Sequence, residues 1–336
     1  MMERVQVKQD SQPAVVVTNL TKRFGEVLAV NDISFQVNKG ELFGFLGPNG
    51  AGKTTTINML TGLARLDAGN IKISGIDCTR NPKAAQHLTG IVPDESNLYP
   101  ELTGFDNLCF CAALYGIQKS ERQTWARELL DIFGLADAAN RKFAGYSKGM
   151  KRKLTFAAGI IHRPPILFLD EPTTGIDVAS ARQVRQIIAD LHSKGTTIFL
   201  TTHYIEEAER LCERIAFIVN GRIVQTDRTA NLLQPIQGKH VIIFSVSNSG
   251  DGLPVEMSSA FPQYQFQSVA SNQISIESME PVNVGPLVRF LEERKIQVTE
   301  ARRHVPSLED VFVQVTGIEA GLMRKEKEKA GGGGNQ

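Results

Sequence analysis

Residues 47–55 read GPNGAGKTT, and this stretch decides the fold. It fits the pattern G-x-x-x-x-G-K-[ST], in which two glycines frame a loop that ends on Lys53 and Thr54. An apolar run, ELFGFL at 41–46, precedes the loop, and a helical pattern, KTTTINMLTGL at 53–63, follows it. A strand, a glycine-rich loop and a helix in this order predict a phosphate-binding loop.

The residue types in this loop suit a triphosphate. Glycines permit the tight turn and let backbone N–H groups approach phosphate oxygens. Lys53 can reach the β- and γ-phosphates, and the Thr54 hydroxyl can ligate Mg²⁺. The predicted nucleotide-binding residues are Gly47, Pro48, Asn49, Gly50, Ala51, Gly52, Lys53, Thr54 and Thr55.

Acidic residues end a second apolar run, ILFLDEP at 166–172. Asp170 is placed to hold Mg²⁺, and Glu171 to orient or deprotonate the attacking water. His203 ends the next run, FLTTH at 199–203, where an imidazole can contact the γ-phosphate and sense its loss. These continuous apolar runs are typical of parallel strands buried on both faces, and the helical pattern at 179–195 between them completes a βαβ unit.

Composition excludes several classes of protein. The 336 residues carry 37 basic and 36 acidic side chains, a balance that argues against a protein made to bind DNA. No apolar run approaches the roughly 18 residues that span a bilayer. The N-terminus, MMERVQVKQDSQP, lacks the apolar core of a signal peptide. The four cysteines lack zinc-type spacing, so we expect reduced thiols in a cytoplasmic protein.

Apolar runs at 14–20, 29–37 and 41–46 predict strands, and NKG at 38–40 predicts a hairpin turn between the last two, with Gly40 at positive φ. Residues 97–162 are mainly helical in pattern, and beyond 233 strands and helices alternate in a small α+β domain. The last helix, within 306–317, would begin at Ser307, with Asp310 completing a weak capping box. The predicted parts are a polar N-terminal extension over 1–13, an ATP-binding domain over 14–232 with a helical subdomain at about 97–162, a small α+β domain over 233–318, and a disordered tail over 319–336.

Several loops occur in the order that a known family of ATPases shows. Over about residues 14–230 the chain resembles the ATP-binding subunit of an ABC transporter. Phe24, in KRFG, stands where that family places an aromatic that stacks on adenine, and TTGID at 173–177 resembles the D-loop, with Asp177 at its aspartate. Asp170, Glu171 and His203 match the metal-binding acid, the catalytic acid and the switch histidine. The resemblance implies an α/β fold: a P-loop NTPase core with an antiparallel β subdomain and a helical subdomain, plus a small C-terminal α+β domain.

The family's signature loop, most often Leu-Ser-Gly-Gly-Gln, corresponds to YSKGM at 146–150. Ser147 and Gly149 are retained, whereas Lys148 and Met150 replace a glycine and the glutamine. Ser147 is a natural N-cap, and the helix start points N–H groups at an anion. The resemblance implies a head-to-tail dimer in which Ser147 and Gly149 of one subunit grip the γ-phosphate bound by Lys53 of the other, and Asp177 also contacts ATP in trans.

A second departure from the family lies at GIVPDESNLYPELTG, residues 90–104. Asp94 stands where the family usually has a glutamine that contacts Mg²⁺ and relays to the membrane partner. A carboxylate can also ligate Mg²⁺, and its charge beside the triphosphate would make activity more dependent on bound metal. We therefore expect Asp94 to take over the relay role; the alternative is a solvated loop acid.

The ending PSLEDVFVQVTG is similar to that of a subclass of ABC ATPases that serve exporters of drugs, antibiotics, polysaccharides and lipids, often with a separate membrane chain. The resemblance implies a Mg²⁺-dependent ATPase that dimerises with itself or a similar ATPase. It would power export through a separate permease, from the cytoplasmic face of the cell membrane. The groove near residues 94–110 would receive a cytoplasmic helix of that permease.

Two other functions compete with transport. The basic cluster over 141–153 suggests an ABC-type ATPase that acts on nucleic acid or ribosomes, but such proteins often carry two cassettes or long coiled-coil insertions. A P-loop kinase would need neither a D-loop nor a signature loop. We expect Lys151, Arg152 and Lys153 on the first turns of a helix, with some of them facing solvent or the permease, and no nucleic acid partner.

Overall fold

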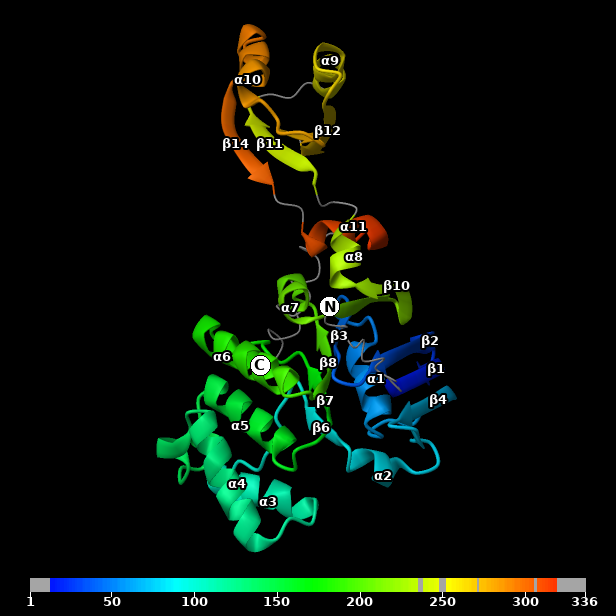
Figure 1. The fold of residues 1–336 in the computed structure, drawn as a ribbon, viewed down its shortest axis with the longest axis vertical. Helices are drawn as coiled ribbons and strands as arrows, with labels where there is room; N and C mark the ends of the chain where they lie inside the picture. The colour runs from blue at the N-terminus through cyan, green and yellow to red at the C-terminus, as the bar shows by residue number, and fades with distance from the viewer. Residues whose placement is uncertain (1–12, 235–237, 248–251, 271, 305–306, 319–336) are drawn as a thin grey trace, which may run out of the picture. The chain divides into compact units, whose positions relative to one another are not determined.

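The computed structural model describes residues 13–234, 238–247, 252–270, 272–304 and 307–318. Backbone contacts divide the chain into two compact units, and Figure 1 labels elements of both where there is room. Unit 1 runs to Thr229 and includes the residues from Val315 onward, whereas unit 2 spans Ala230–Gln314. The predicted N-terminal extension, apart from Pro13, and the predicted tail over 319–336 lie outside the described residues.

A six-stranded sheet in the order β10-β9-β3-β8-β7-β6 forms the centre of unit 1. All of its strands except the antiparallel edge strand β10 (Arg222–Arg228) run parallel. The parallel strands are β3 (Leu42–Leu46), β6 (Thr89–Val92), β7 (Ile166–Asp170), β8 (Thr197–Thr202) and β9 (Arg214–Val219). Every residue of β3, β7 and β8 is buried, and for β7 and β8 this confirms the prediction of strands covered on both faces.

A second, antiparallel sheet in the order β2-β1-β4-β5 contains β1 (Pro13–Phe24), β2 (Val27–Asn38), β4 (Ala68–Ile73) and β5 (Ile76–Asp77). The predicted hairpin between 29–37 and 41–46 is wrong, because β2 pairs with β1 and β3 enters the other sheet. The physical reason is burial: β2 alternates between buried and exposed residues, whereas β3 is buried throughout and fits only between two buried strands. Gly40 does have positive φ, at 73°, in the turn that connects the sheets.

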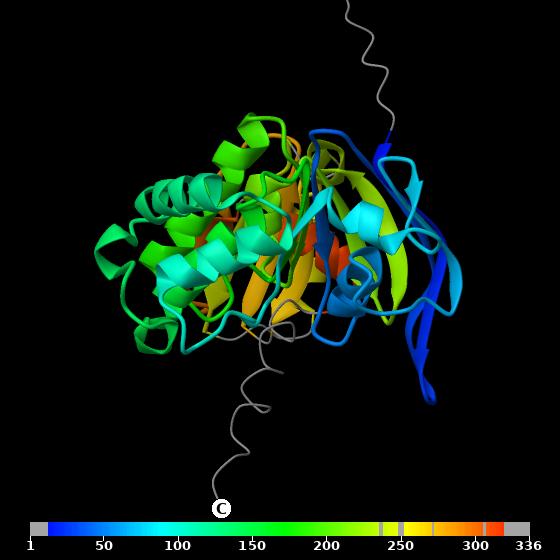
Figure 2. The ribbon, with the colours of Figure 1, turned by 90° about the horizontal axis from the view of Figure 1, so that it is seen from below.

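Helices cover the six-stranded sheet. In Figures 1 and 2 the teal and green helices lie on one side of unit 1 and the blue strands β1 and β2 on the other. The larger helices are α1 (Lys53–Leu60), α3 (Gly104–Leu114), α4 (Lys119–Ile132), α5 (Lys148–Ile160) and α6 (Val178–Ser193). The shorter ones are α2 (Pro82–Gln86) and α7 (Ile205–Leu211). Helix α8 (Thr229–Leu233) begins at the last residue of this part of unit 1 and lies otherwise in unit 2. The helical pattern predicted over 97–162 is confirmed by α3, α4 and α5.

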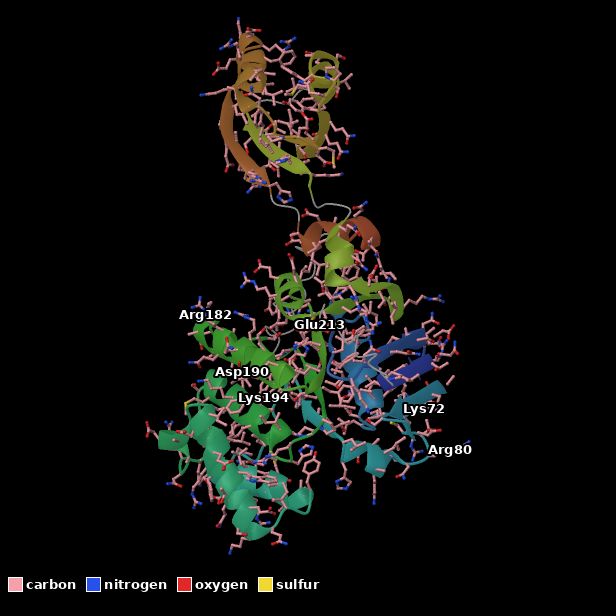
Figure 3. The ribbon with its side chains drawn as sticks, viewed as in Figure 1. Lys72, Arg80, Arg182, Asp190, Lys194 and Glu213 are labelled. Carbon is pink, nitrogen blue, oxygen red and sulfur yellow. The ribbon has the colours of Figure 1, made fainter. Side chains whose placement is uncertain are left out.

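Helix α6 shows how the helical spacing sorts side chains. Val184 and Ile188, four residues apart, are buried on its inner face. Arg182, Asp190 and Lys194, all labelled in Figure 3, are exposed along the same segment. The apolar stripe therefore holds α6 against unit 1 and leaves its charged residues in water.

Unit 2 contains a four-stranded antiparallel sheet in the order β12-β13-β11-β14. Its strands are β11 (His240–Val246), β12 (Gln265–Ala270), β13 (Gln273–Ser278) and β14 (Val298–His304), and its helices include α9 (Leu253–Ala260), α10 (Val284–Glu293) and the first part of α11 (Leu308–Thr316). The sequence β-α-β-β-α-β with this strand order is the ferredoxin-like arrangement. The predicted alternation of strands and helices and the predicted last helix, α11, are confirmed. In α9 only Leu253 and Met257 are buried.

The Asp310 carboxylate accepts a 2.7 Å hydrogen bond from the Ser307 N–H, which confirms the reciprocal half of the predicted capping box. All four cysteines, Cys78, Cys109, Cys111 and Cys212, are free thiols. Within the described ranges, no helix has both the length and the apolar character that a bilayer crossing requires.

Candidate functional site

The predicted phosphate loop connects β3 to the start of α1 at Lys53. A Cβ atom at Gly47 would lie 2.1 Å from the Ile218 carbonyl oxygen, and one at Gly52 would lie 2.4 Å from the Ala29 carbonyl oxygen. Gly52 also has φ 100°, in the left-handed region. Only glycine fits at these two positions, so the close approach of the backbone to its neighbours fixes the shape of the loop.

Lys53 is buried, with 5% of its surface exposed, and its ammonium group lies inside the loop. Nζ donates to the carbonyl oxygens of Gly47 at 2.8 Å and Pro48 at 3.1 Å. It also forms an ion pair with Glu171 Oε1 at 3.2 Å. The loop therefore holds a cation at the first turn of α1, where the helix end also favours an anion.

Glu171 follows β7 and is buried. Its φ of 50° is unusual for a residue other than glycine. Its N–H donates to the Thr201 carbonyl oxygen at 3.1 Å, and its Oε2 accepts from the Thr174 hydroxyl at 2.9 Å and lies 2.5 Å from His203 Nδ1. Burial alone would raise the pKa of Glu171, but the hydrogen bond from His203 and the charge of Lys53 lower it to about 2. Glu171 is thus held as a carboxylate between the Lys53 ammonium group and the His203 ring.

Asp170 ends β7 and is buried beside Glu171. Its Oδ1 accepts a 2.5 Å hydrogen bond from the Thr201 hydroxyl. Burial raises the pKa of Asp170, and hydrogen bonds from Thr201 and Thr54 act against that rise. The bond from Thr54 places a hydroxyl and a carboxylate, both oxygen ligands, side by side at the phosphate loop.

This donor set fits Mg²⁺. Within the described part of the chain, no three His, Cys, Asp or Glu side chains gather as a metal cage. Mg²⁺ in nucleotide enzymes is usually held by one or two carboxylates, phosphate oxygens and water, so Thr54 and Asp170 suffice as the protein's share.

The structure brings the predicted catalytic residues together. His203 follows β8, Glu171 follows the adjacent strand β7, and Lys53 begins the helix after β3, the neighbour of β8 on its other side. Because the carboxyl ends of parallel strands meet at one edge of the sheet, residues that are distant in sequence converge there. The sequence-based grouping of Lys53, Asp170, Glu171 and His203 therefore corresponds to one cluster.

Asp94 follows β6, the strand beside β7, and is half-buried. Burial is the main reason why the pKa of Asp170 is raised, and the charge of Asp94 adds to the rise. The carboxylates of Asp94 and Asp170 are therefore near each other. Its backbone carbonyl accepts a 3.0 Å hydrogen bond from Arg152. Asp94 thus lies at the edge of the cluster, on the side of the helical subdomain.

Phe24 ends β1 and is 53% exposed. The only contact that its ring makes among those given for the described residues is with Lys22, whose Nζ lies 5.1 Å from the ring centre. The ring is therefore not part of the hydrophobic core, and it has a free face.

Ser147 caps α5, and its hydroxyl accepts from the Met150 N–H at 3.3 Å, as the sequence predicted. Gly149 packs against α6: a Cβ there would lie 2.5 Å from Ser180 Oγ and 3.4 Å from Asp177 Oδ2. Asp177 in turn caps α6, accepting from the Ser180 N–H at 2.9 Å. The signature loop and the D-loop therefore contact each other within one chain.

No hydrogen bond or ion pair among the described residues joins Ser147 or Gly149 to Lys53 or Glu171 of the same chain. Ser147 is exposed, so its hydroxyl is available to another molecule.

Two residues of this region were not predicted. Arg152 on α5 is buried and donates hydrogen bonds to the backbone beside Asp94, Asp170 and Glu171. Glu207 on α7 is buried and accepts a 2.8 Å hydrogen bond from the Thr173 hydroxyl. A signal for Arg152 existed in the helical spacing, because it lies three residues after Gly149.

The comparisons with known proteins agree with this geometry. Residues 30–174 match the family described as ABC transporter. The chain is 35% identical to the linearmycin resistance ATP-binding protein LnrL of Bacillus subtilis, over 89% of this chain and 97% of that protein. It is 36% identical to the Nod factor export ATP-binding protein I of Burkholderia orbicola, over 90% and 96%. It is 34% identical to the doxorubicin resistance ATP-binding protein DrrA of Mycobacterium tuberculosis, over 90% and 93%.

Solved structures are similar to about two thirds of this chain. An ATP-binding subunit of an ABC transporter superposes with a TM-score of 0.61 at 29% identity, covering 66% of this chain and 93% of that one. A dimeric ATP-binding cassette in a post-hydrolysis state, bound to ADP and Pi, superposes with a TM-score of 0.60 at 26% identity, covering 64% and 98%. The predicted fold class, a P-loop NTPase core with an antiparallel β subdomain, is confirmed.

Proposed function

The chain belongs to the ABC transporter family as an ATPase, and on that premise we propose that it powers export of a substrate through a separate membrane permease. Two copies, or this chain and a similar ATPase, bind ATP with Mg²⁺ and close head to tail. Hydrolysis and loss of products reopen the dimer. The observation that carries the proposal is the cluster of Lys53, Asp170, Glu171 and His203 at one edge of the sheet.

The charges of the cluster suit hydrolysis. Lys53 is shared between the loop carbonyls and Glu171, and the β- and γ-phosphates of ATP would compete with Glu171 for it. When Lys53 moves to phosphate, Glu171 loses a neighbouring cation, and its pKa rises toward the range of a useful base. Glu171 then takes a proton from the water that attacks the γ-phosphorus, and ADP departs as the bond to its terminal oxygen breaks.

His203 and the metal-binding residues complete the assignment. His203, whose Nδ1 lies against Glu171, orients that carboxylate and presents its ring to the γ-phosphate. Mg²⁺, held by Thr54, Asp170 and Asp94, would neutralise charge that develops on the phosphate oxygens. Phe24 offers its free ring face to adenine, a contact that suits any base.

The exposed hydroxyl of Ser147 supports the dimer. It lies at the N-terminus of α5, where backbone N–H groups favour an anion, yet it has no link to Lys53 of its own chain. A γ-phosphate held by the other subunit fits this place. Gly149 and Asp177 lie beside it and would share the contact in trans.

An apolar recess supports the permease partner. A cavity of about 370 Å³ is lined in part by Leu63, which follows α1, and by Leu114 at the end of α3. Both leucines are about two-thirds exposed, at 67% and 68%. Tyr99 and Phe110 are also exposed, and their rings pack edge to face. Both residues belong to the segment 94–110 of the predicted groove. A cytoplasmic helix of the permease would cover such side chains, and this subunit would then lie at the inner face of the cell membrane.

The proposal is tested with Glu171→Gln. This variant keeps the shape of the side chain and removes the base, so hydrolysis should fall by about 10²–10⁴-fold, while ATP still binds. An ATP-dependent dimer should then accumulate in gel filtration with Mg²⁺. Glu206→Gln, at an exposed carboxylate on α7, is the matched control and should behave as the parent protein does. Rapid turnover of the Glu171 variant without a dimer would count against the assignment.

A further inference from the structure

We propose that Arg152 is a positioning residue that fixes the N-terminus of α5, the loop after β6 and the backbone at Glu171 relative to one another. The inference rests on the proposed function, because it takes Glu171 as the base and Ser147 as the contact to the other subunit's phosphate. It gives Arg152, a member of the basic cluster over 141–153, a role that neither the loop motifs nor that cluster indicated.

The guanidinium of Arg152 is buried, with 6% of the residue exposed. It donates five hydrogen bonds, which uses every N–H that an arginine side chain has. The acceptors are the backbone carbonyl oxygens of Pro172 (from Nε, 2.7 Å), Pro93 and Asp94 (both from Nη1, the latter at 3.0 Å), and Asp170 and Glu171 (both from Nη2, 2.9 and 3.0 Å).

These acceptors belong to two segments that follow adjacent parallel strands, β6 and β7. Asp94, the predicted relay residue, lies in the first segment, and Glu171 lies in the second. A single planar group therefore joins the relay loop to the catalytic loop. Thr155, one turn further along α5, adds a 2.8 Å hydrogen bond to Ser96 Oγ, so α5 is tied to the relay loop at two points.

Three of the five hydrogen bonds of Arg152 go to the segment in which the backbone is strained. Glu171 has φ 50°, a conformation that costs free energy for a residue with a side chain and persists only where its surroundings impose it. Arg152 binds the carbonyl of Glu171 and the carbonyls of its two neighbours, Asp170 and Pro172. These three bonds hold the kink that aims the Glu171 carboxylate at Lys53 and His203.

Arg152 also lies little more than one helical turn after Ser147. Arg152 is hydrogen-bonded to the loop that contains Asp94 and to the backbone of Glu171, and it belongs to α5, which Ser147 caps. A movement of the Asp94 loop would therefore shift Ser147 and Glu171 together. Lysine cannot replace it, because one ammonium nitrogen cannot reach carbonyls spread over two segments.

The experiment compares Arg152→Lys and Arg152→Met with Lys153→Met. Lys153 is the next residue of α5 and is half-buried, and its side chain makes no hydrogen bond or ion pair within the described ranges. For each variant we would measure kcat and KM for ATP, the affinity for ATP, the melting of unit 1 by the fluorescence of its single tryptophan, Trp125, and ATP-driven dimerisation in the Glu171→Gln background.

For Arg152→Lys we expect kcat to fall by about 10- to 100-fold, the cost of a misplaced catalytic group, with ATP affinity within about threefold of the parent value. Dimerisation in the Glu171→Gln background should need about tenfold more ATP, because Ser147 shifts as well. Arg152→Met should show larger effects in the same direction, and Lys153→Met none.

Three outcomes are distinguishable. If Arg152→Lys keeps its kcat while Glu171→Gln is inactive, the role of Arg152 is refuted and the proposed function stands. If kcat and ATP affinity fall together in proportion to the folded fraction, Arg152 serves stability alone and the inference is refuted. If Glu171→Gln turns over normally, the catalytic assignment fails, and the role of Arg152 fails with it.

Discussion

Glu207 is a buried carboxyl group on α7, next to the loop that follows Glu171, and its titration can be tested directly. Its Oε1 accepts from the Thr173 hydroxyl at 2.8 Å, but its Oε2 is buried and has no hydrogen-bond partner within the described residues. Burial raises the pKa of Glu207; hydrogen bonds from Thr173 and Thr202 and the charge of Arg185 on α6 oppose the rise, and Glu171 adds to it. We predict that Glu207→Gln removes a pH-dependent destabilisation of unit 1.

The magnitude follows from linkage. A folded-state pKa above the ordinary value of 4.5 means that Glu207 contributes stability below that value and loses it as pH rises toward the folded-state pKa. Between the two pKa values only the native state binds the proton, so the parent protein loses about 1.4 kcal/mol of unfolding free energy per pH unit relative to the variant. Above the folded-state pKa, the difference becomes constant.

The assay is urea unfolding between pH 4.5 and pH 8. Trp125, the only tryptophan, lies in α4 of unit 1, so its fluorescence reports the unfolding of that unit. Glu206→Gln is the matched control, because Glu206 is the preceding residue of α7 and is exposed. The control should follow the parent protein at every pH.

Two results would refute the reasoning. A parent-minus-variant difference that does not change with pH would mean that Glu207 titrates at its ordinary value in the native state. An equal slope in Glu206→Gln would mean that the effect comes from net charge and not from burial.

Three further substitutions test the predicted contacts of the site. Phe24→Ala should weaken ATP binding about tenfold by removing a base-stacking contact, whereas Val27→Ala, exposed in the same hairpin, should not; equilibrium titration checks this. Asp94→Ala should raise the Mg²⁺ concentration for half-maximal hydrolysis about threefold or more, with Glu95→Ala as the exposed control, and an unchanged Mg²⁺ titration would make Asp94 a solvated loop acid. Ser147→Arg should leave ATP binding to the monomer intact and lower ATP-driven dimerisation at least tenfold by gel filtration in a hydrolysis-deficient background, because a bulky cation replaces the cap.

Features that depend on local chemistry were predictable from the sequence. The phosphate loop requires glycine where the backbone passes within touching distance of a neighbour, as at Gly47 and Gly52, so its pattern is visible in the residues themselves. The strands β7 and β8 are buried on both faces, and their uninterrupted apolar runs say so. Because parallel strands align their carboxyl ends, placing Glu171 and His203 after such runs was enough to predict that they meet.

Features that depend on distant partners were not predictable. The turn at Gly40 has the chemistry of a hairpin, but the partner of a strand is decided by which faces it must bury. A short stretch of sequence around Gly40 contains β2 and β3 one after the other. It contains neither β8 nor β9, the strands with which β3 pairs. The turn residues therefore gave the correct backbone conformation and the wrong pairing.

The basic stretch at 146–154 depends both on local sequence and on distant partners. Its spacing places Arg152 three residues after Gly149 and four before Phe156, and all three are buried on one face of α5. Charge alone favours a solvated position for Arg152, whereas the helical period favours a buried one. Arg152 is buried, as the helical period favours, because five carbonyl acceptors replace the water that the guanidinium loses. Without these acceptors the free-energy cost of burying the charge would be too large. A cation on the buried face of an amphipathic helix therefore indicates a nearby set of carbonyl acceptors, and here those carbonyls belong to the segments around Asp94 and Glu171.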